Sequence, residues 1–404
     1  MLGGRAGRGI PPTDQIRSVG MDRAWPTGLV LAGLAAAFAF PALRLSVTPG
    51  LILGVLVPGL VFEAAFALDR RDLRAVAGPL AALAVPGVLI SAGVVTVVLA
   101  AVVGLPVELA FVLGAITAAT DPVAVVATLA RLEVPPRLRT LVEGESLLND
   151  GTGLILFVLA LEAAAGSLGI AEGILRFAVI LTASVAIGAV AGFLADRAMA
   201  VAGHAALHLA ISLVLAYGAY QAADRLGLSG IVATVVGAVI LGSRMRDRGD
   251  AAAAVQQLDR LWSAVALLLT SITLLGIGFA IDVTALGAAA GAIAAGTAAV
   301  LVARALMVYV PLAIRRAAGH AEIPPGWDHV LFWSGLRGAI ALAAALSLPE
   351  TIPQRLLLQQ IAFGIVLVTL LIQGGTAPFV ISRALRSRSP APHPRSRHTA
   401  TGAR

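Results

Sequence analysis

Residues 141–157 read LVEGESLLNDGTGLILF, a polar stretch inside a run that is otherwise apolar and long enough to cross a membrane as a helix. In helical geometry four of its polar side chains share one face: Glu145, Ser146, Asn149 and Asp150. An ionised carboxylate at membrane depth costs roughly 2.5–3.5 kcal/mol on insertion scales. We therefore expect this face to line a polar cavity, to pair with a cationic side chain or to bind an ion.

Composition places the chain among integral membrane proteins. Of its 404 residues, 59% are hydrophobic and only 13% are charged, whereas a soluble domain carries about 25% charged residues. The apolar runs recur about every 25 to 35 residues and can cross a hydrocarbon core about 30 Å thick as helices. They are continuous and do not alternate with polar residues, which favours helices over a transmembrane β-barrel.

The apolar runs predict an all-α polytopic membrane protein with about twelve transmembrane helices. Residues 26–385 form one transmembrane domain in this prediction, whereas residues 1–25 and 386–404 are disordered cytoplasmic tails. The spans are expected at about 27–45, 49–68, 74–103, 106–131, 138–164, 170–199, 204–224, 228–243, 257–281, 285–314, 327–348 and 356–384.

The basic residues predict the orientation. All 29 are arginines, and most lie in the tails and in alternate loops, as the positive-inside rule expects of the cytoplasmic side. Both termini are therefore predicted to be cytoplasmic, and the net charge of +7 reflects topology rather than nucleic-acid binding. The chain has no cysteine, which excludes disulfides and thiolate metal sites. The arginines off the cytoplasmic side are Arg44, Arg176, Arg225 and Arg355 outside, and Arg304 and Arg337 within spans.

Two spans are interrupted at their centres. Residues 118–122 read AATDP, where proline removes a backbone donor and disfavours helical geometry at Asp121. Residues 334–338 read SGLRG, a charged residue between glycines. Broken helices in corresponding places of two halves indicate a secondary-transporter site, built from inverted repeats that cross at the bilayer midplane.

Few ionisable side chains lie inside the predicted spans. Two arginines face three central carboxylates, so one carboxylate has no fixed counter-ion and can hold either a proton or a metal cation. The main members of this set are Glu63, Asp121, Glu145, Asp150, Arg304 and Arg337.

We assign the exchanging group to Asp150. Asp121 is expected beside it, and Thr120 and Ser146 add neutral oxygen donors, which suit alkali cations. Asn149 would steady the site as a neutral neighbour of Asp150.

The remaining carboxylate, Glu145, is expected to pair with Arg304 and hold two helices together. Spacing alone allows a pair with Arg337 equally well. Arg337 itself either closes the bundle or influences ion binding.

At these residues the chain resembles the monovalent cation/proton antiporters of the electroneutral sodium/proton exchanger type, as found in bacteria. The resemblance covers about residues 50–380, and its motifs come in the family's order and spacing. They are TDP at 120–122, EGESLLNDG at 143–151, ARA at 303–305, GLRGA at 335–339 and LIQG at 371–374.

The resemblance implies an inverted-repeat fold with an ion-transport core and dimerisation helices, a homodimer, and an elevator-like movement. It also implies that Asp150 alternately binds H⁺ and Na⁺ or Li⁺, with Asp121, Thr120 and Ser146 helping to coordinate the cation. The Asn149–Asp150 pair marks electroneutral one-for-one exchange in this family.

The same resemblance makes Glu145 and Arg304 a structural ion pair and Arg337 a second core arginine. The chain departs from the family pattern in two places. Relatives commonly have one more span before the Thr-Asp pair, and Ser334 stands where a glycine is usual.

Other interpretations of the carboxylates explain fewer residues. Asp121 could merely cap a half-helix. Asp121 and Asp150 could form an intramembrane aspartyl protease dyad, but Asp150 lacks the Gly-x-Gly-Asp context and a dyad needs no buried arginine. A channel would not require broken helices around a titratable carboxylate.

The sequence thus predicts a secondary antiporter, not an enzyme, that exchanges Na⁺ (or Li⁺) for H⁺ electroneutrally, with both ions competing for Asp150. K⁺/H⁺ exchange by the same mechanism is the alternative, because cation selectivity depends on cavity geometry. No cofactor is expected, and no phosphate-binding glycine loop with its lysine is present. The expected location is the bacterial inner (plasma) membrane, and the expected partners are monovalent cations, protons, the lipid bilayer and a second copy of the chain.

Overall fold

The computed structural model describes residues 25–39, 48–132, 134–248, 251–281, 283–319, 323–324 and 326–386. Throughout these residues the regular structure is helical, which confirms the all-α prediction. Apart from Trp25 and Arg386, both predicted tails lie outside the described residues. Their disorder and the division of the chain into tails and one domain therefore stay predictions.

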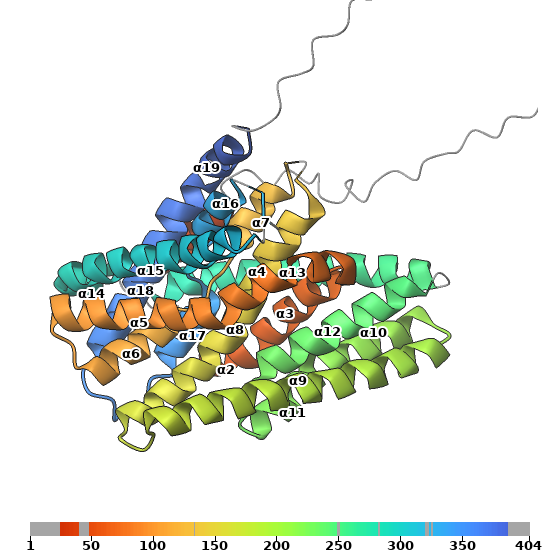
Figure 1. Ribbon diagram of the computed structural model, residues 1–404, viewed down its shortest axis with the longest axis horizontal. Helices are drawn as coiled ribbons and strands as arrows, with labels where there is room; N and C mark the ends of the chain where they lie inside the picture. The colour runs from red at the N-terminus through yellow and green to blue at the C-terminus, as the bar shows by residue number, and fades with distance from the viewer. Residues whose placement is uncertain are drawn as a thin grey trace, which may run out of the picture.

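The helices lie where the apolar runs predict spans, and most bounds agree to within a few residues (Figure 1). Short π-helical or 3₁₀ segments, labelled η, interrupt several of them. The elements are α1 (Trp25–Ala39), α2 (Pro49–Leu51), η2 (Ile52–Leu56), α3 (Val57–Ala67), α4 (Arg70–Ala82), η3 (Leu83–Gly87), α5 (Val88–Val98), η4 (Leu99–Val103), α6 (Val107–Ile116), α7 (Val123–Leu129), α8 (Pro136–Ala164), α9 (Ile170–Val201), α10 (Ala205–Leu213), η5 (Val214–Gly218), α11 (Ala219–Arg225), α12 (Gly230–Asp247), α13 (Ala252–Ala280), α14 (Val283–Leu286), η7 (Gly287–Ala289), α15 (Ala290–Ala317), α16 (Trp327–Trp333), α17 (Ala339–Leu346), α18 (Arg355–Val368), η8 (Thr369–Gly374) and α19 (Gly375–Arg386).

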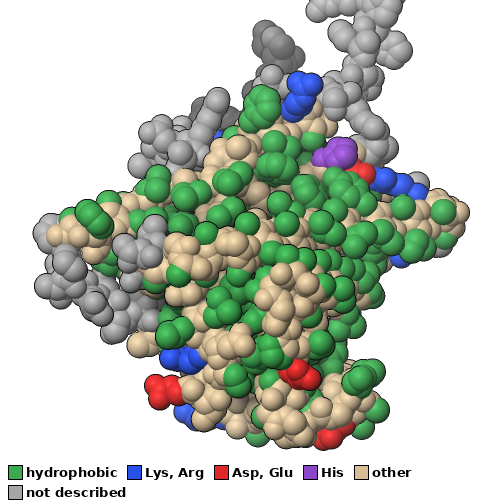
Figure 2. Space-filling model, turned by 90° about the vertical axis from the view of Figure 1, so that its left-hand side faces the viewer, with side chains coloured by type: hydrophobic (Ala, Val, Ile, Leu, Met, Phe, Trp, Pro, Cys, Tyr) green, Lys and Arg blue, Asp and Glu red, His purple; other side chains and the backbone are tan. Residues whose placement is uncertain are grey.

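In the described part of the chain, 8 helices are long and apolar enough to cross a membrane, judged by length and composition. The other predicted spans are too short or too charged to be among these eight, each for a local reason. α1 borders residues outside the described part, α12 ends in charged side chains, and two spans are interrupted. Figure 2 shows apolar side chains over the middle of one face and charged side chains toward its two ends, as expected of a protein embedded in a bilayer.

The two predicted breaks are real, and they meet. α6 ends at Ile116 before Pro122, and α16 ends at Trp333 before the glycine-flanked stretch. The backbone amide of Asp121 in one break donates to the carbonyl of Leu336 in the other at 2.8 Å. The interrupted stretches therefore cross each other, which confirms the prediction of two broken helices that cross.

Helix α8, which carries the polar stretch, packs against helices from two groups on opposite sides of it. It contacts α4, η3, α6 and α7, and also α3, α9 and α12. In Figure 1, α9 to α12 lie together on one side of the molecule, while α5, α6, α15 and α18 lie together on the other. The predicted roles of such groups, ion transport and dimerisation, stay predictions.

Candidate functional site

The polar face of α8 is buried against the crossing of the broken spans. Asn149 and Ser146 are almost completely buried, whereas Asp150 keeps partial exposure. The Ser146 hydroxyl donates to the carbonyl of Thr120 at 2.5 Å, and Asn149 Nδ2 lies 3.5 Å from Thr120 Oγ1. Residues that sequence reasoning assigned to one site thus join the break after α6 to the middle of α8.

Asp121 lies at the point where two half-helices begin. Its Oδ1 accepts a hydrogen bond from the amide of Val123 at 3.1 Å, and its carboxylate also faces the amide of Ala339, the first residue of α17. Helix N-termini favour negative charge, because their amides are unpaired and their dipoles are positive. Asp121 and Asp150 are close enough to repel each other electrostatically, and both are partly exposed.

Glycine at position 338 allows the side chain of Asp121 to lie against the start of α17. A Cβ added at Gly338 would run into the side chain of Asp121. A Cβ added at Gly335 would lie 2.6 Å from Arg304 Nε. The two glycines of the second break are therefore needed for close packing rather than for flexibility alone.

The structure pairs Glu145 with Arg304 and not with Arg337. Arg304 Nη1 donates to Glu145 Oε1 at 2.6 Å, Nη2 donates to Oε2 at 3.0 Å, and each residue is 1% exposed. Asn149 donates to the same Oε1 atom. This bidentate pair joins α8 to α15, an arrangement that spacing alone had left open.

Arg304 also holds the second broken span. It donates to the carbonyl of Leu331 and, from Nη2, to Ser334 Oγ at 3.1 Å. The Ser334 hydroxyl in turn donates to the Leu331 carbonyl at 2.8 Å. The serine that departs from the family pattern is therefore built into the arginine's hydrogen-bond network.

Arg337 is 0% exposed and projects from the second break. Its backbone amide donates to Thr369 Oγ1 at 3.1 Å. Sequence reasoning missed Thr369, although its place four residues before Gln373, in the LIQG motif, puts it on the same helical face. A second missed hydroxyl is Thr152, which donates at 2.9 Å to the carbonyl of Ala84 in the π-helical segment η3.

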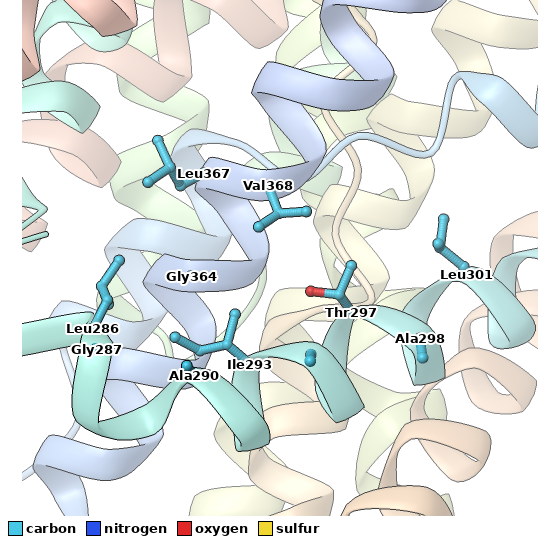
Figure 3. A pocket seen from close by; sticks show the side chains of 11 residues that line it. Leu286, Gly287, Ala290, Ile293, Thr297, Ala298, Leu301, Gly364, Leu367 and Val368 are labelled. Atoms are coloured by element: carbon cyan, nitrogen blue, oxygen red, sulfur yellow. The ribbon is translucent and has the colours of Figure 1, made fainter.

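A cavity of about 620 Å³ lies away from these residues, between α15 and α18 (Figure 3). Aliphatic side chains and glycines line it, with Thr297 as its polar member, and none of the assigned site residues takes part. An apolar cavity of this kind does not suit a small cation, so we place the candidate site at the crossing and not in this cavity. Among the described residues, no group of three or more His, Asp or Glu side chains could hold a metal ion.

Residues 17–383 match the family described as "Sodium/hydrogen exchanger, transmembrane". The chain is 33% identical over 359 residues to the low-affinity Na⁺/H⁺ antiporter NhaS1 of Synechocystis, covering 87% of this chain and 68% of the relative. It is 32% identical over 378 residues to the Na⁺/H⁺ antiporter ApNhaP of Aphanothece halophytica, covering 93% and 72%.

A solved structure has a similar fold. The sodium proton antiporter MjNhaP1 of Methanocaldococcus jannaschii aligns with a TM-score of 0.67, covering 90% of this chain and 98% of that chain. The sequence identity in this alignment is 17%, so the likeness concerns the fold alone.

Proposed function

The chain belongs to the sodium/hydrogen exchanger family, and from this premise we propose that it exchanges Na⁺ for H⁺ across the plasma membrane as a secondary antiporter. The similar sequences named above belong to Na⁺/H⁺ antiporters. The observation that carries the proposal is the position of Asp150, a partly exposed carboxylate on α8 beside the crossing of two broken spans. Ion gradients drive the exchange.

The cation binds to oxygen atoms that the crossing brings together. Carboxylates of Asp150 and Asp121, with the oxygens of Thr120 and Ser146, are hard donors that suit Na⁺ or Li⁺. Broken helices support such a site, because their ends leave backbone acceptors and donors unpaired at membrane depth. Asn149 takes no charge, and its amide steadies both Glu145 and Thr120.

Exchange follows from competition for one carboxylate. Asp150 holds either a proton or Na⁺, so each ion leaves when the other binds, and one proton is exchanged for one Na⁺ without net charge movement. Glu145 and Arg304 stay paired through the cycle, because their hydrogen bonds satisfy each other. K⁺/H⁺ exchange by the same steps is the alternative outcome of the test below.

The direct test is proton movement in proteoliposomes that contain the purified protein, with Na⁺, Li⁺ or K⁺ added outside and with the membrane potential clamped or unclamped. Proton movement that requires Na⁺ and ignores the potential is the expected result. A requirement for K⁺ would support the alternative. Folded protein without any cation-dependent proton movement would contradict the proposed function.

A further inference from the structure

Arg337 is a buried cation that neither packing nor pairing explains. Its Nε, Nη1 and Nη2 atoms have no hydrogen-bond partner among the residues that the structure describes. Its place is set through the backbone, by the bond from its amide to Thr369 Oγ1. A buried charge without a partner is costly. An apolar side chain would therefore hold the helices together better than arginine at this position.

The second buried arginine shows the contrast. Arg304 donates to both oxygens of Glu145 and to the carbonyl of Leu331. Its charge and its hydrogen-bond donors are thus matched by α8 and α16, and it acts as a structural connection between them.

Arg337 faces the charges of the site without bonding to them. It is repelled by Arg304 and attracted electrostatically by Glu145 and Asp150. Glu145 already has Arg304 and Asn149 as hydrogen-bond partners, so among the described residues Asp150 is the carboxylate near Arg337 whose charge no arginine side chain pairs with. Asp150 is repelled electrostatically by Asp121 and attracted by Arg337.

The charges of the site then balance in a simple way. Arg304 cancels Glu145, and one positive charge at Arg337 stands against two negative charges at Asp121 and Asp150. We propose that Arg337 is the fixed counter-charge of the exchange site, cancelling one aspartate, so that a single Na⁺ or a single H⁺ makes the site neutral. This inference rests on the proposed function and adds the reason for a one-for-one ratio.

Neutrality matters because moving net charge through a low-dielectric region is costly. With Arg337 in place, the site is neutral when it carries one Na⁺ or one H⁺ and negative when it is empty. The two loaded forms can therefore switch between the inward-open and the outward-open state, whereas the charged empty form cannot do so readily. Coupling of the two ions follows from this difference.

The test compares Arg337→Gln with Arg337→Lys. Glutamine removes the positive charge that weakens the attraction between the aspartates and a bound cation. The affinity for Na⁺ should therefore rise by about tenfold or more. Na⁺-dependent thermal stabilisation of the purified protein measures it. Lysine keeps the charge and should keep the affinity. A merely structural role would lower the affinity or leave it unchanged, and either result in a folded Arg337→Gln protein would overturn the proposal.

Transport gives the second readout. In Arg337→Gln the Na⁺-loaded site keeps a negative charge, so exchange should fall by at least about tenfold and should become dependent on the membrane potential. The double variant Asp121→Asn/Arg337→Gln removes one charge of each sign. Its exchange should be slower, because one cation ligand is altered, but independent of the potential. Potential-dependent exchange in this double variant would overturn the proposal, even where the single variant does not fold.

Controls separate this inference from the proposed function. Arg316→Gln removes a cytoplasmic-end arginine that pairs with Asp328 at 3.1 Å, and it should change neither readout. The wild-type protein tests the proposed function, since it must show Na⁺-dependent proton movement. Exchange by Arg337→Gln at the wild-type rate and without potential dependence would leave the function standing and overturn the role of Arg337.

Discussion

Asp150 is the residue on which the proposed exchange depends. Asp150→Asn keeps the shape of the side chain and an oxygen that can face the amide of Thr120, but it removes the charge that Na⁺ and H⁺ share. We expect this variant to fold and to show no Na⁺-dependent proton movement in proteoliposomes. Asp224→Asn, on the exposed end of α11, serves as the matched control and should exchange normally. Wild-type exchange by Asp150→Asn would rule out the assignment.

Competition for one carboxylate also predicts a pH dependence with a definite sign. As the pH falls, protons occupy Asp150 and Na⁺ binds more weakly. The apparent dissociation constant for Na⁺ should rise by about tenfold per pH unit in the range where the proton is bound, since one proton displaces one cation. Na⁺ titrations of the purified protein at a series of pH values measure this slope. A constant Na⁺ affinity across the series would show separate sites for the two ions.

The two kinds of ion pair in the protein should differ in their effect on stability. Glu145→Gln leaves Arg304 as an uncompensated buried charge and should destabilise the protein by about 3–5 kcal/mol. Glu162→Gln breaks an exposed pair with Arg176 and should cost about 1 kcal/mol or less. Unfolding of both variants in the same detergent gives the comparison. Equal losses would mean that burial does not decide the strength of these pairs.

At the scale of elements, the crossing depends on the closeness of α17 to the break before α7. Gly338→Ala places a methyl group against the side chain of Asp121 and must push the two half-helices apart. We expect Na⁺-dependent exchange to fall by at least about tenfold, because small displacements of a reacting group are costly. Gly291→Ala on α15 meets open space and is the control. Normal exchange by Gly338→Ala would show that the crossing tolerates separation.

At the scale of the whole molecule, the arginine distribution predicts that both termini are cytoplasmic. This orientation puts the α8–α9 turn outside and the turn after α15 inside. Because the chain has no cysteine, single cysteines can report on it without background. A membrane-impermeant thiol reagent should label Ser167→Cys from outside the cell and should label Ala318→Cys only after the cells are opened. The opposite pattern would invert the topology.

The class of protein, the course of the spans and the position of the breaks follow from the amino-acid sequence alone. These features depend on local chemistry: an apolar run must be helical in lipid, and Pro122 removes a donor wherever the rest of the chain lies. The sequence also identifies Asp121, Glu145 and Asp150 as candidate site residues, because charged side chains at membrane depth are rare and costly.

Which of these groups lie next to each other depends on the packing of the helices. The choice of Arg304 over Arg337 as partner of Glu145, the approach of Gly338 to Asp121 and the bond from Arg337 to Thr369 join residues of different helices. Such contacts depend on how each helix is rotated about its axis and how closely it packs on its neighbours. Spacing along one helix restricts the face on which a side chain lies, but it contains no information about which side chain of another helix lies opposite.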